Sequence, residues 1–424
     1  MMAARRVVAS SAVATSRRVF PGASNGEFDL PAALDRVLAR GDGARVWDDE
    51  GREYRDFTCG WGSALVGHAR PEVVAAVVRQ APLGSNFSYV SEESARLGAR
   101  IQALSPCVDR LRFVASGTEA NLYCERLARA FTGRPTILKF DGAYHGAHEL
   151  GVTSFHGATH ERPAAPTPAA PACAPRGVGD RVLVAPFNDL AAVEGILEDR
   201  AEDVAAVFVE PVHRCTPPAP GFLEGLREAT RRRNVLLVFD EVVTGFRLAL
   251  GGAQEHYGVE PDLVAYGKGL GGGYPIGCFG GRADVVDVVD EARHSAGDEP
   301  AYVWSASTLG GNPISCAAAN AALDIFERPE TYPRLRGLGR RFREGLRAVL
   351  AARGVDGVVV GDGPIAQIQF ADEARKRRVL LGLFERGIFL NPISTKLYLS
   401  LAHTDADLAF FCETLDATLV EAQS

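Results

Sequence analysis

The sequence predicts an α/β protein built on a mostly parallel β-sheet, with a second and smaller α+β domain. Apolar runs alternate with amphipathic stretches over most of the chain, which is the pattern of successive β/α units. The runs Val204–Val209 and Val235–Phe239 do not alternate with polar residues, which is typical of strands covered on both faces. After Asn312-Pro313 the pattern changes to long helices and short strands, which indicates a separate domain.

In the large domain we expect strands at the apolar runs and helices at the amphipathic stretches between them. Residues 160–177 are rich in proline and alanine, so we expect a long loop there, either a lid or a spacer. The expected helices include Gly117–Phe131, Leu190–Asp199 and Gly221–Arg233. The expected strands are Thr136–Phe140, Arg181–Ala185, Val204–Val209, Val235–Phe239 and Leu263–Tyr266.

The C-terminal part is expected to mix helices with short strands. We expect helices at about 315–326, at 334–353, around 374–386 and from Asp405 onward. The expected strands are Gly357–Val360, Ala366–Phe370 and a pair formed by Ile388–Leu390 and Leu397–Leu401.

Composition excludes several classes of protein. The chain has 424 residues, of which 46% are hydrophobic and 23% charged, as in an ordinary soluble globular protein. The net charge of -7 provides no basic surplus for nucleic-acid binding, and no apolar stretch is long enough to span a bilayer. The eight cysteines include no C-x-x-C pair, which argues against structural zinc, any other metal site or a disulfide framework and favours a reducing compartment.

Lys268 is the residue with the clearest chemical meaning. Only four of the 46 basic residues are lysines, and Lys268 stands alone in the glycine run 267–273. A preference for arginine in a GC-rich genome explains the scarcity of lysine but not this position. A lysine free of bulky neighbours can form a Schiff base with an aldehyde. Asp240 follows the apolar run Val235–Phe239, and a carboxylate there can keep a pyridine nitrogen protonated. Together they predict pyridoxal 5'-phosphate (PLP) as cofactor; the alternative for Asp240 is a salt bridge to an arginine.

Two further motifs fit a phosphorylated planar cofactor. Ser116 and Glu119 have the spacing of a capping box that begins a helix ending near Gly133, and a helix N-terminus can hold a phosphate. Taken alone, an ordinary capped helix is the simpler interpretation. Tyr144 and His145 follow a strand directly, where an aromatic ring can stack on a ligand. The alternative is a core tyrosine beside a hydrogen-bonded histidine.

Taken in order, these motifs resemble the class III PLP-dependent aminotransferases, and most of all the glutamate-1-semialdehyde aminomutase subgroup. The resemblance runs from about residue 10 to the C-terminus. It implies a type I PLP-dependent transferase fold, with a mostly parallel seven-stranded sheet and a smaller α+β domain from both chain ends. The implied domains are an N-terminal segment at 1–65, the large PLP-binding domain at 66–320 and the C-terminal small domain at 321–424. The segments that carry the resemblance are 116–120, 144–146, 220–227, 239–247, 267–273, 308–313 and 400–404.

Carried over residue by residue, the resemblance implies a catalytic pair and a cofactor site. Lys268 binds the cofactor and moves a proton between it and the substrate, while Asp240 pairs with the ring nitrogen. Tyr144 and Val242 cover the two ring faces. Thr308 reaches the phosphate of the neighbouring subunit, which implies a homodimer with shared sites. The implied cofactor-binding set is Ser116, Gly117, Thr118, Tyr144, His145, Glu210, Asp240, Val242, Lys268 and Thr308, with Trp61 on the substrate side.

The chain also departs from the aminomutase subgroup. Cys215 stands where the subgroup has an asparagine that contacts the ring hydroxyl, and Val243 replaces the glutamine of other class III members. Segment 392–398 lacks the subgroup's glutamate, and the proline-rich stretch 160–177 replaces its gating loop. The arginine that several relatives carry near the N-terminal turn is absent from 22–27.

We therefore expect an aminotransferase that moves an amino group from an amine or amino-acid donor to a carbonyl acceptor by a ping-pong mechanism. The second hypothesis is an aminomutase, which moves the amino group within one molecule. A third is a PLP-fold protein without catalysis, which the intact Lys268, Asp240 and Tyr144 disfavour. Arg214 and Lys396 are candidate anchors for a substrate anion, although surface charge is the simpler interpretation of each.

The N-terminus allows two interpretations. Residues 1–20 contain four arginines and no acidic residue, which resembles an organellar transit peptide. The alternative is a short surface helix before the turn at Pro21-Gly22. Because relatives begin with a helix before this turn, we expect the helix and a cytoplasmic protein.

Overall fold

The computed structural model describes residues 12–26, 30–31, 34–155, 177, 179–294, 302–391 and 394–423. The described chain divides into two compact units, which are treated separately below. The first unit combines Met1–Pro71 with Pro333–Ser424, and the second is Glu72–Tyr332. Residues 12–19 are helical, in line with the expected surface helix, whereas the predicted loop at 160–177 lies outside the described residues except for Gly177.

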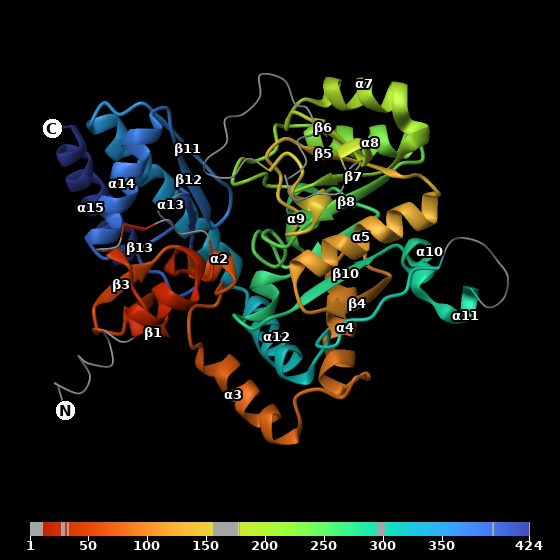
Figure 1. Cartoon of the computed structure of the whole chain (residues 1–424), viewed down its shortest axis with the longest axis horizontal. Coiled ribbons are helices and arrows are strands. Elements are labelled where there is room, and N and C mark those ends of the chain that lie inside the picture. Colours follow the sequence, from red (N-terminus) through yellow and green to blue (C-terminus); the bar gives the residue numbers. More distant parts are fainter. Residues whose placement is uncertain are drawn as a thin grey trace. The chain divides into compact units, whose positions relative to one another are not determined.

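The second unit is built on a mostly parallel sheet, as predicted (Figure 1). Among the described residues, seven strands follow the order β4-β10-β9-β8-β7-β5-β6. Strands β9, β8, β7, β5 and β6 run parallel to one another, and β10 runs antiparallel to β9 and β4. The strands are β4 (Arg110–Val114), β5 (Thr136–Phe140), β6 (Val182–Ala185), β7 (Val204–Val209), β8 (Leu236–Asp240), β9 (Leu263–Tyr266) and β10 (Gly277–Gly281).

The apolar-run rule found the parallel strands and missed the antiparallel ones. Strand β4 carries two arginines and β10 carries three glycines, so neither has the composition of a buried apolar run. Close contacts explain the glycines. A Cβ at Gly277 would lie 2.2 Å from the carbonyl oxygen of Ser116, and one at Gly281 would lie 2.2 Å from that of Asp262. Strand β10 is therefore glycine-rich because neighbouring backbone passes directly against it.

Helix α5 (Gly117–Thr132) begins at this close contact. The Ser116 side chain accepts a hydrogen bond from the backbone N–H of Glu119, and the helix ends at Gly133 in the left-handed conformation. The reciprocal half of the predicted capping box is absent from the described bonds, because the Glu119 carboxylate accepts from Ala115 instead, at 2.8 Å. The buried face of α5, with Leu127, shares one apolar cluster with residues of the sheet. The sheet thus fixes the position of the helix start.

The other helices of this unit lie before, between and after the strands along the chain (Figure 1). Their bounds are α3 (Pro71–Gln80), α4 (Glu92–Leu104), α6 (Glu149–Val152), α7 (Leu190–Arg200), α8 (Phe222–Arg232), α9 (Gly252–Tyr257), α10 (Ala283–Val286), α11 (Glu291–His294) and α12 (Pro313–Phe326).

The first unit joins both ends of the chain around one apolar core. Phe57 from the N-terminal part packs against Phe342 and Phe411, with ring centroids 5.4 and 4.7 Å away. The two described sheets have the orders β1-β2-β3-β13 and β11-β12-β14. The helices are α2 (Cys59–Gly62), α13 (Thr331–Ala352), α14 (Glu373–Glu385) and α15 (Asp405–Gln423). The strands are β1 (Leu38–Asp42), β2 (Arg45–Asp48), β3 (Glu53–Asp56), β11 (Gly357–Val360), β12 (Ile365–Phe370), β13 (Ile388–Phe389) and β14 (Lys396–Tyr398).

The predicted pairing of Ile388–Leu390 with Leu397–Leu401 is wrong. Strand β13 pairs with β3 in parallel, whereas β14 pairs with β12 in antiparallel orientation. The two runs are short and close in sequence, which suggested a hairpin, but each completes a different sheet. Within the described part of the chain, no helix is long and apolar enough to cross a membrane.

We predict that Gly277→Ala destabilises the protein and disturbs the start of α5, because the added Cβ would lie 2.2 Å from the Ser116 carbonyl oxygen. Forced overpacking of this kind costs about 1–3 kcal/mol. Thermal unfolding measures the loss. Gly195→Ala in α7 is the control, since nothing lies within 4 Å of its Cβ and helix propensity favours alanine. Equal melting temperatures for Gly277→Ala and the wild type would contradict the prediction.

Candidate active site

The candidate residues gather where the parallel strands end. Parallel strands present their carboxyl ends at one edge of a sheet, and ligands bind there in open α/β folds. Tyr144 follows β5, Glu210 follows β7, Asp240 ends β8 and Lys268 follows β9. The parallel arrangement of these strands therefore brings a tyrosine, a lysine and two carboxylates to one edge of the sheet.

Asp240 is held by hydrogen bonds around its carboxylate. Its Oδ2 atom accepts from Asn121 Nδ2 at 2.9 Å and lies 2.8 Å from His145 Nδ1, while Oδ1 accepts from the N–H of Val242 at 3.1 Å. The side chain is buried, and among the described residues no lysine or arginine forms a salt bridge with it. A buried carboxylate without a strong cation is costly, so this position favours a cationic ligand.

Lys268 lies in a constrained turn directly after β9. Its φ is 42°, in the left-handed region that side chains rarely adopt. Burial lowers the pKa of Lys268, and the charges of Asp240 and Glu210 oppose that shift. A lowered pKa increases the fraction of neutral amine near neutral pH, which is the form that attacks an aldehyde.

The Glu210 carboxylate ties two segments together. One oxygen accepts from the backbone N–H of Tyr144 at 2.9 Å, and the other accepts from the N–H of Arg214 at 3.0 Å. The Tyr144 ring packs on Phe155 with centroids 5.2 Å apart. Glu210 therefore fixes the backbone of both flanking segments.

The start of α5 lies against the same edge. A Cβ at Gly117 would meet Val242 at 2.8 Å, and one at Gly267 would lie 3.5 Å from the Cα of Gly117. Thr118 lies against Gly146, whose Cβ would approach the Thr118 Cα to 2.8 Å. The N–H groups of Gly117 and Thr118 precede the first α5 hydrogen bond, donated by Ala120. This helix end thus offers N–H donors for an anion beside Val242.

Two residues with structural roles were missed in the sequence. Asn121 lies one helical turn after Gly117 and reaches Asp240; its spacing of four residues was the available signal. Lys139 on β5 is 1% exposed, and its Nζ donates to the carbonyl oxygens of segment 143–153. The described acceptors are Ala143 at 3.1 Å, Leu150 at 3.4 Å, Gly151 at 2.9 Å and Thr153 at 2.8 Å. Lys139 therefore fastens the segment that carries Tyr144 and His145.

Two further predicted site residues, Trp61 and Thr308, are not tested by these contacts. Trp61 belongs to the first unit, on α2, and is 42% exposed. Thr308 is exposed in the second unit, where its carbonyl oxygen accepts from Asn86 at 3.0 Å. Both stay predictions.

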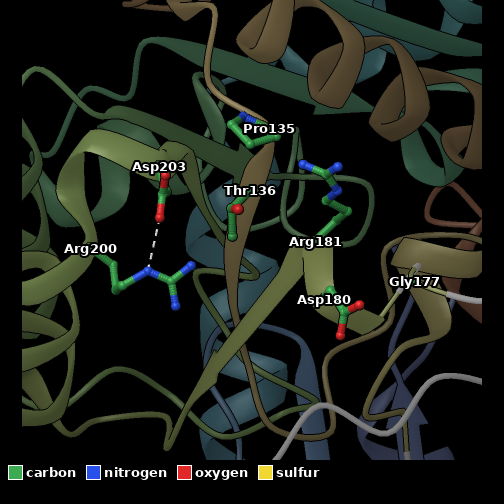
Figure 2. Close-up of a pocket in the computed structure, with 7 residues that line it drawn as sticks. All are labelled: Pro135, Thr136, Gly177, Asp180, Arg181, Arg200 and Asp203. Atoms are coloured by element: carbon green, nitrogen blue, oxygen red, sulfur yellow. Dashed lines mark hydrogen bonds and ion pairs between the residues drawn. The ribbon is translucent and has the colours of Figure 1, made fainter.

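A pocket of about 330 Å³ lies at the opposite end of the parallel strands, where they begin (Figure 2). Its lining includes Thr136, which begins β5, and Asp203, which precedes β7. Asp203 accepts from Arg200 at 2.9 Å, as Figure 2 shows. Because these residues stand at the amino ends of the strands, this pocket is separate from the cluster of Asp240 and Lys268.

Comparison with known proteins places this geometry in a family. The sequence model described as "Aminotransferase class-III" matches residues 31–419. The chain belongs to the class III aminotransferases. A curated relative from Thermomicrobium roseum, glutamate-1-semialdehyde 2,1-aminomutase, is 38% identical over 96% of both chains. An omega-transaminase from Sphaerobacter thermophilus has a TM-score of 0.90 at 33% identity, over 98% of each chain. A transaminase with PLP bound has a TM-score of 0.89 at 27% identity, over 98% of each chain.

The fold of this class III aminotransferase is the type I PLP-dependent transferase fold, and PLP is its cofactor. The residues present fit that cofactor. Asp240 is a buried carboxylate that lacks a lysine or arginine partner among the described residues, and a protonated pyridine nitrogen would supply that cation. Lys268 is a partly buried lysine with a lowered pKa, suited to bind an aldehyde. The α5 start offers N–H donors for the phosphate.

We predict that Lys139→Met lowers the free energy of unfolding by about 3–5 kcal/mol, because it leaves several buried carbonyl oxygens without a donor. Burial lowers the pKa of Lys139 to about 8, below its ordinary value of 10.5. Between these pH values the unfolded chain binds more protons than the folded one, so this lysine makes stability rise with pH.

The stability gap between wild type and Lys139→Met should therefore widen from pH 8 to pH 10.5 in denaturant titrations. Lys376→Met is the control, because Lys376 forms a surface pair with Glu373 and should have little effect. A gap that narrows over this range would contradict the assignment.

Proposed function

We propose that this class III enzyme is an intermolecular aminotransferase, which moves an amino group from an amine donor to a separate carbonyl acceptor. The observation that carries the proposal is the meeting of Lys268, with its lowered pKa, and the buried Asp240 at one sheet edge. PLP bound there supplies an aldehyde and an electron-withdrawing ring. The amino group leaves the donor in one half-reaction and reaches the acceptor in a second.

The residues divide the work by position. Lys268 would bind the cofactor aldehyde and exchange a proton with the substrate carbon, for which its lowered pKa suits it. Asp240 holds the ring nitrogen protonated, and Asn121 and His145 fix its carboxylate. Tyr144 and Val242 would cover the two ring faces.

The remaining residues would hold the cofactor phosphate or support the backbone around the cofactor. Ser116, Gly117 and Thr118 receive the phosphate at the start of α5. Glu210 orients Tyr144 through its backbone N–H. Trp61 contacts the substrate.

An aminomutase is the second candidate, and one observation favours it. The curated relative from Thermomicrobium roseum carries the aminomutase name at 38% identity. Two observations favour intermolecular transfer. Segment 392–398 has no glutamate, which the aminomutase subgroup carries there, and an omega-transaminase shares the fold at a TM-score of 0.90.

The half-reaction without an acceptor separates the two candidates. Purified PLP-loaded enzyme is mixed with single amine donors, and the visible spectrum and the released carbonyl compound are measured. We predict that at least one donor converts the cofactor to its amine form with about one carbonyl product per subunit. Lys268→Ala is the control and should lose this conversion by a large factor. Spectral change only with a diamino or semialdehyde compound, without carbonyl release, would favour the aminomutase.

We also infer a homodimer from an exposed apolar surface of the second unit. The side chain of Asn86 donates to the Thr308 carbonyl at 3.0 Å, which joins segment 83–90 to segment 304–309. Large exposed apolar side chains on one connected surface are typical of an interface. They are Leu83 (70% exposed), Phe87 (51%), Tyr89 (86%), Val90 (70%), Trp304 (69%) and Leu309 (55%). A second copy covering this surface brings Thr308 to its neighbour's phosphate.

We predict that the double variant Leu83→Asp, Tyr89→Asp shifts the protein toward monomer and weakens PLP retention, because two buried charges would oppose association. Light scattering after size-exclusion chromatography measures the mass. Val358→Asp on β11 changes an exposed apolar residue outside this surface and is the control. An unchanged dimer in the double variant, or a monomeric wild type, would refute this interface.

A further inference from the structure

The turn after β7 holds two residues in an uncommon backbone conformation. The N–H of Thr216 donates to the carbonyl oxygen of His213 at 2.7 Å, and these two residues pair as an antiparallel bridge. Between them, Arg214 and Cys215 have φ values of 49° and 78°. Asparagine and glycine are the usual residues where both central φ values are positive, because a Cβ crowds the backbone there. An arginine at this position therefore has a strained backbone conformation, and such strain concentrates at functional sites.

From this turn, the Arg214 guanidinium reaches Phe155, which packs on Tyr144. Its Cζ atom lies 4.9 Å from the centre of the Phe155 ring. The Arg214 N–H donates to Glu210, whose other oxygen holds the Tyr144 N–H. One carboxylate therefore sets the positions of the guanidinium and of the ring that covers the cofactor.

The charge of Arg214 is also available to a ligand. Among the described residues, its guanidinium stacks on Phe155 and forms no ion pair with a carboxylate, unlike Arg227 and Arg282, which both pair with Asp262. The positive charge of Arg214 is near enough to Lys268 to contribute to the lowering of its pKa. A substrate at Lys268 is therefore within the electrostatic influence of this cation.

We propose that Arg214 binds a carboxylate of the amine donor, so that the preferred donors are amino acids rather than simple amines. The planar guanidinium can hold both oxygens of a carboxylate, and stacking on Phe155 keeps the plane oriented. This inference rests on the proposed aminotransferase function and adds the chemical class of its donor.

The test uses matched donors on the PLP-loaded enzyme. Alanine is compared with isopropylamine, and β-aminobutanoate with sec-butylamine, because each pair exchanges a carboxylate for a methyl group. The rate of cofactor conversion without acceptor is measured against donor concentration. In the wild type, one amino acid should exceed its matched amine by about 10- to 100-fold in kcat/KM, the size of a charge-assisted pair.

Arg214→Asn should abolish that preference, because KM should rise much more for the amino acid than for the matched simple amine. Because asparagine tolerates positive φ, the variant should melt at the same or a higher temperature. Arg214→Lys should keep only part of the wild-type preference, because lysine retains the positive charge but lacks the planar guanidinium that can hold both carboxylate oxygens. Arg126→Gln is the matched control, because it removes an exposed arginine stacked on Tyr123.

Two results would overturn the inference. If Arg214→Asn slows both members of a pair equally, or changes neither, Arg214 is not the anchor although the aminotransferase function stands. If no donor converts the cofactor in the wild type, the proposed function fails and the anchor fails with it.

Discussion

The buried carboxylate of Asp240 is the constraint on which the rest of the site depends. It stands at the end of β8, where Asn121 and His145 hold one oxygen and the Val242 N–H holds the other. Neutral donors of this kind stabilise the charge and fix its direction. A carboxylate held in this way keeps a pyridine nitrogen protonated, so the ring can accept electrons from the substrate. In the proposed function, an ion pair between this carboxylate and the ring nitrogen would set the position of the cofactor ring relative to Lys268 and the ring-covering residues.

The fold supports this carboxylate through close backbone contacts and buried polar links. Gly277 lets the chain at Ser116 lie against β10, and Gly117 lets α5 begin against Val242. Lys139 fastens segment 143–153, which carries His145 to Asp240. Each support depends on the size or the charge of one residue, so few other residues could replace it. Together these contacts hold the side chains of the site in position.

The sequence allowed the prediction of elements whose signal is local. The apolar runs predicted β5, β7 and β9 with the bounds that the structure has, and Asp240 and Lys268 stand at strand ends as expected. Contacts between distant segments left no such signal. Because β10 is rich in glycine, its sequence did not predict a buried strand. The sequence around Lys139 likewise did not predict its hydrogen bonds to carbonyl oxygens up to 14 residues away. Thr308 stays a prediction because its expected ligand belongs to another subunit.

The protonation state of the cofactor nitrogen tests the account most directly. Enzyme loaded with nitrogen-labelled PLP is studied by nitrogen NMR, together with Asp240→Asn. The account predicts a protonated ring nitrogen in the wild type across neutral and mildly alkaline pH, and loss of that proton in Asp240→Asn. A ring nitrogen that is unprotonated in the wild type, or equally protonated in the variant, would contradict the role of Asp240.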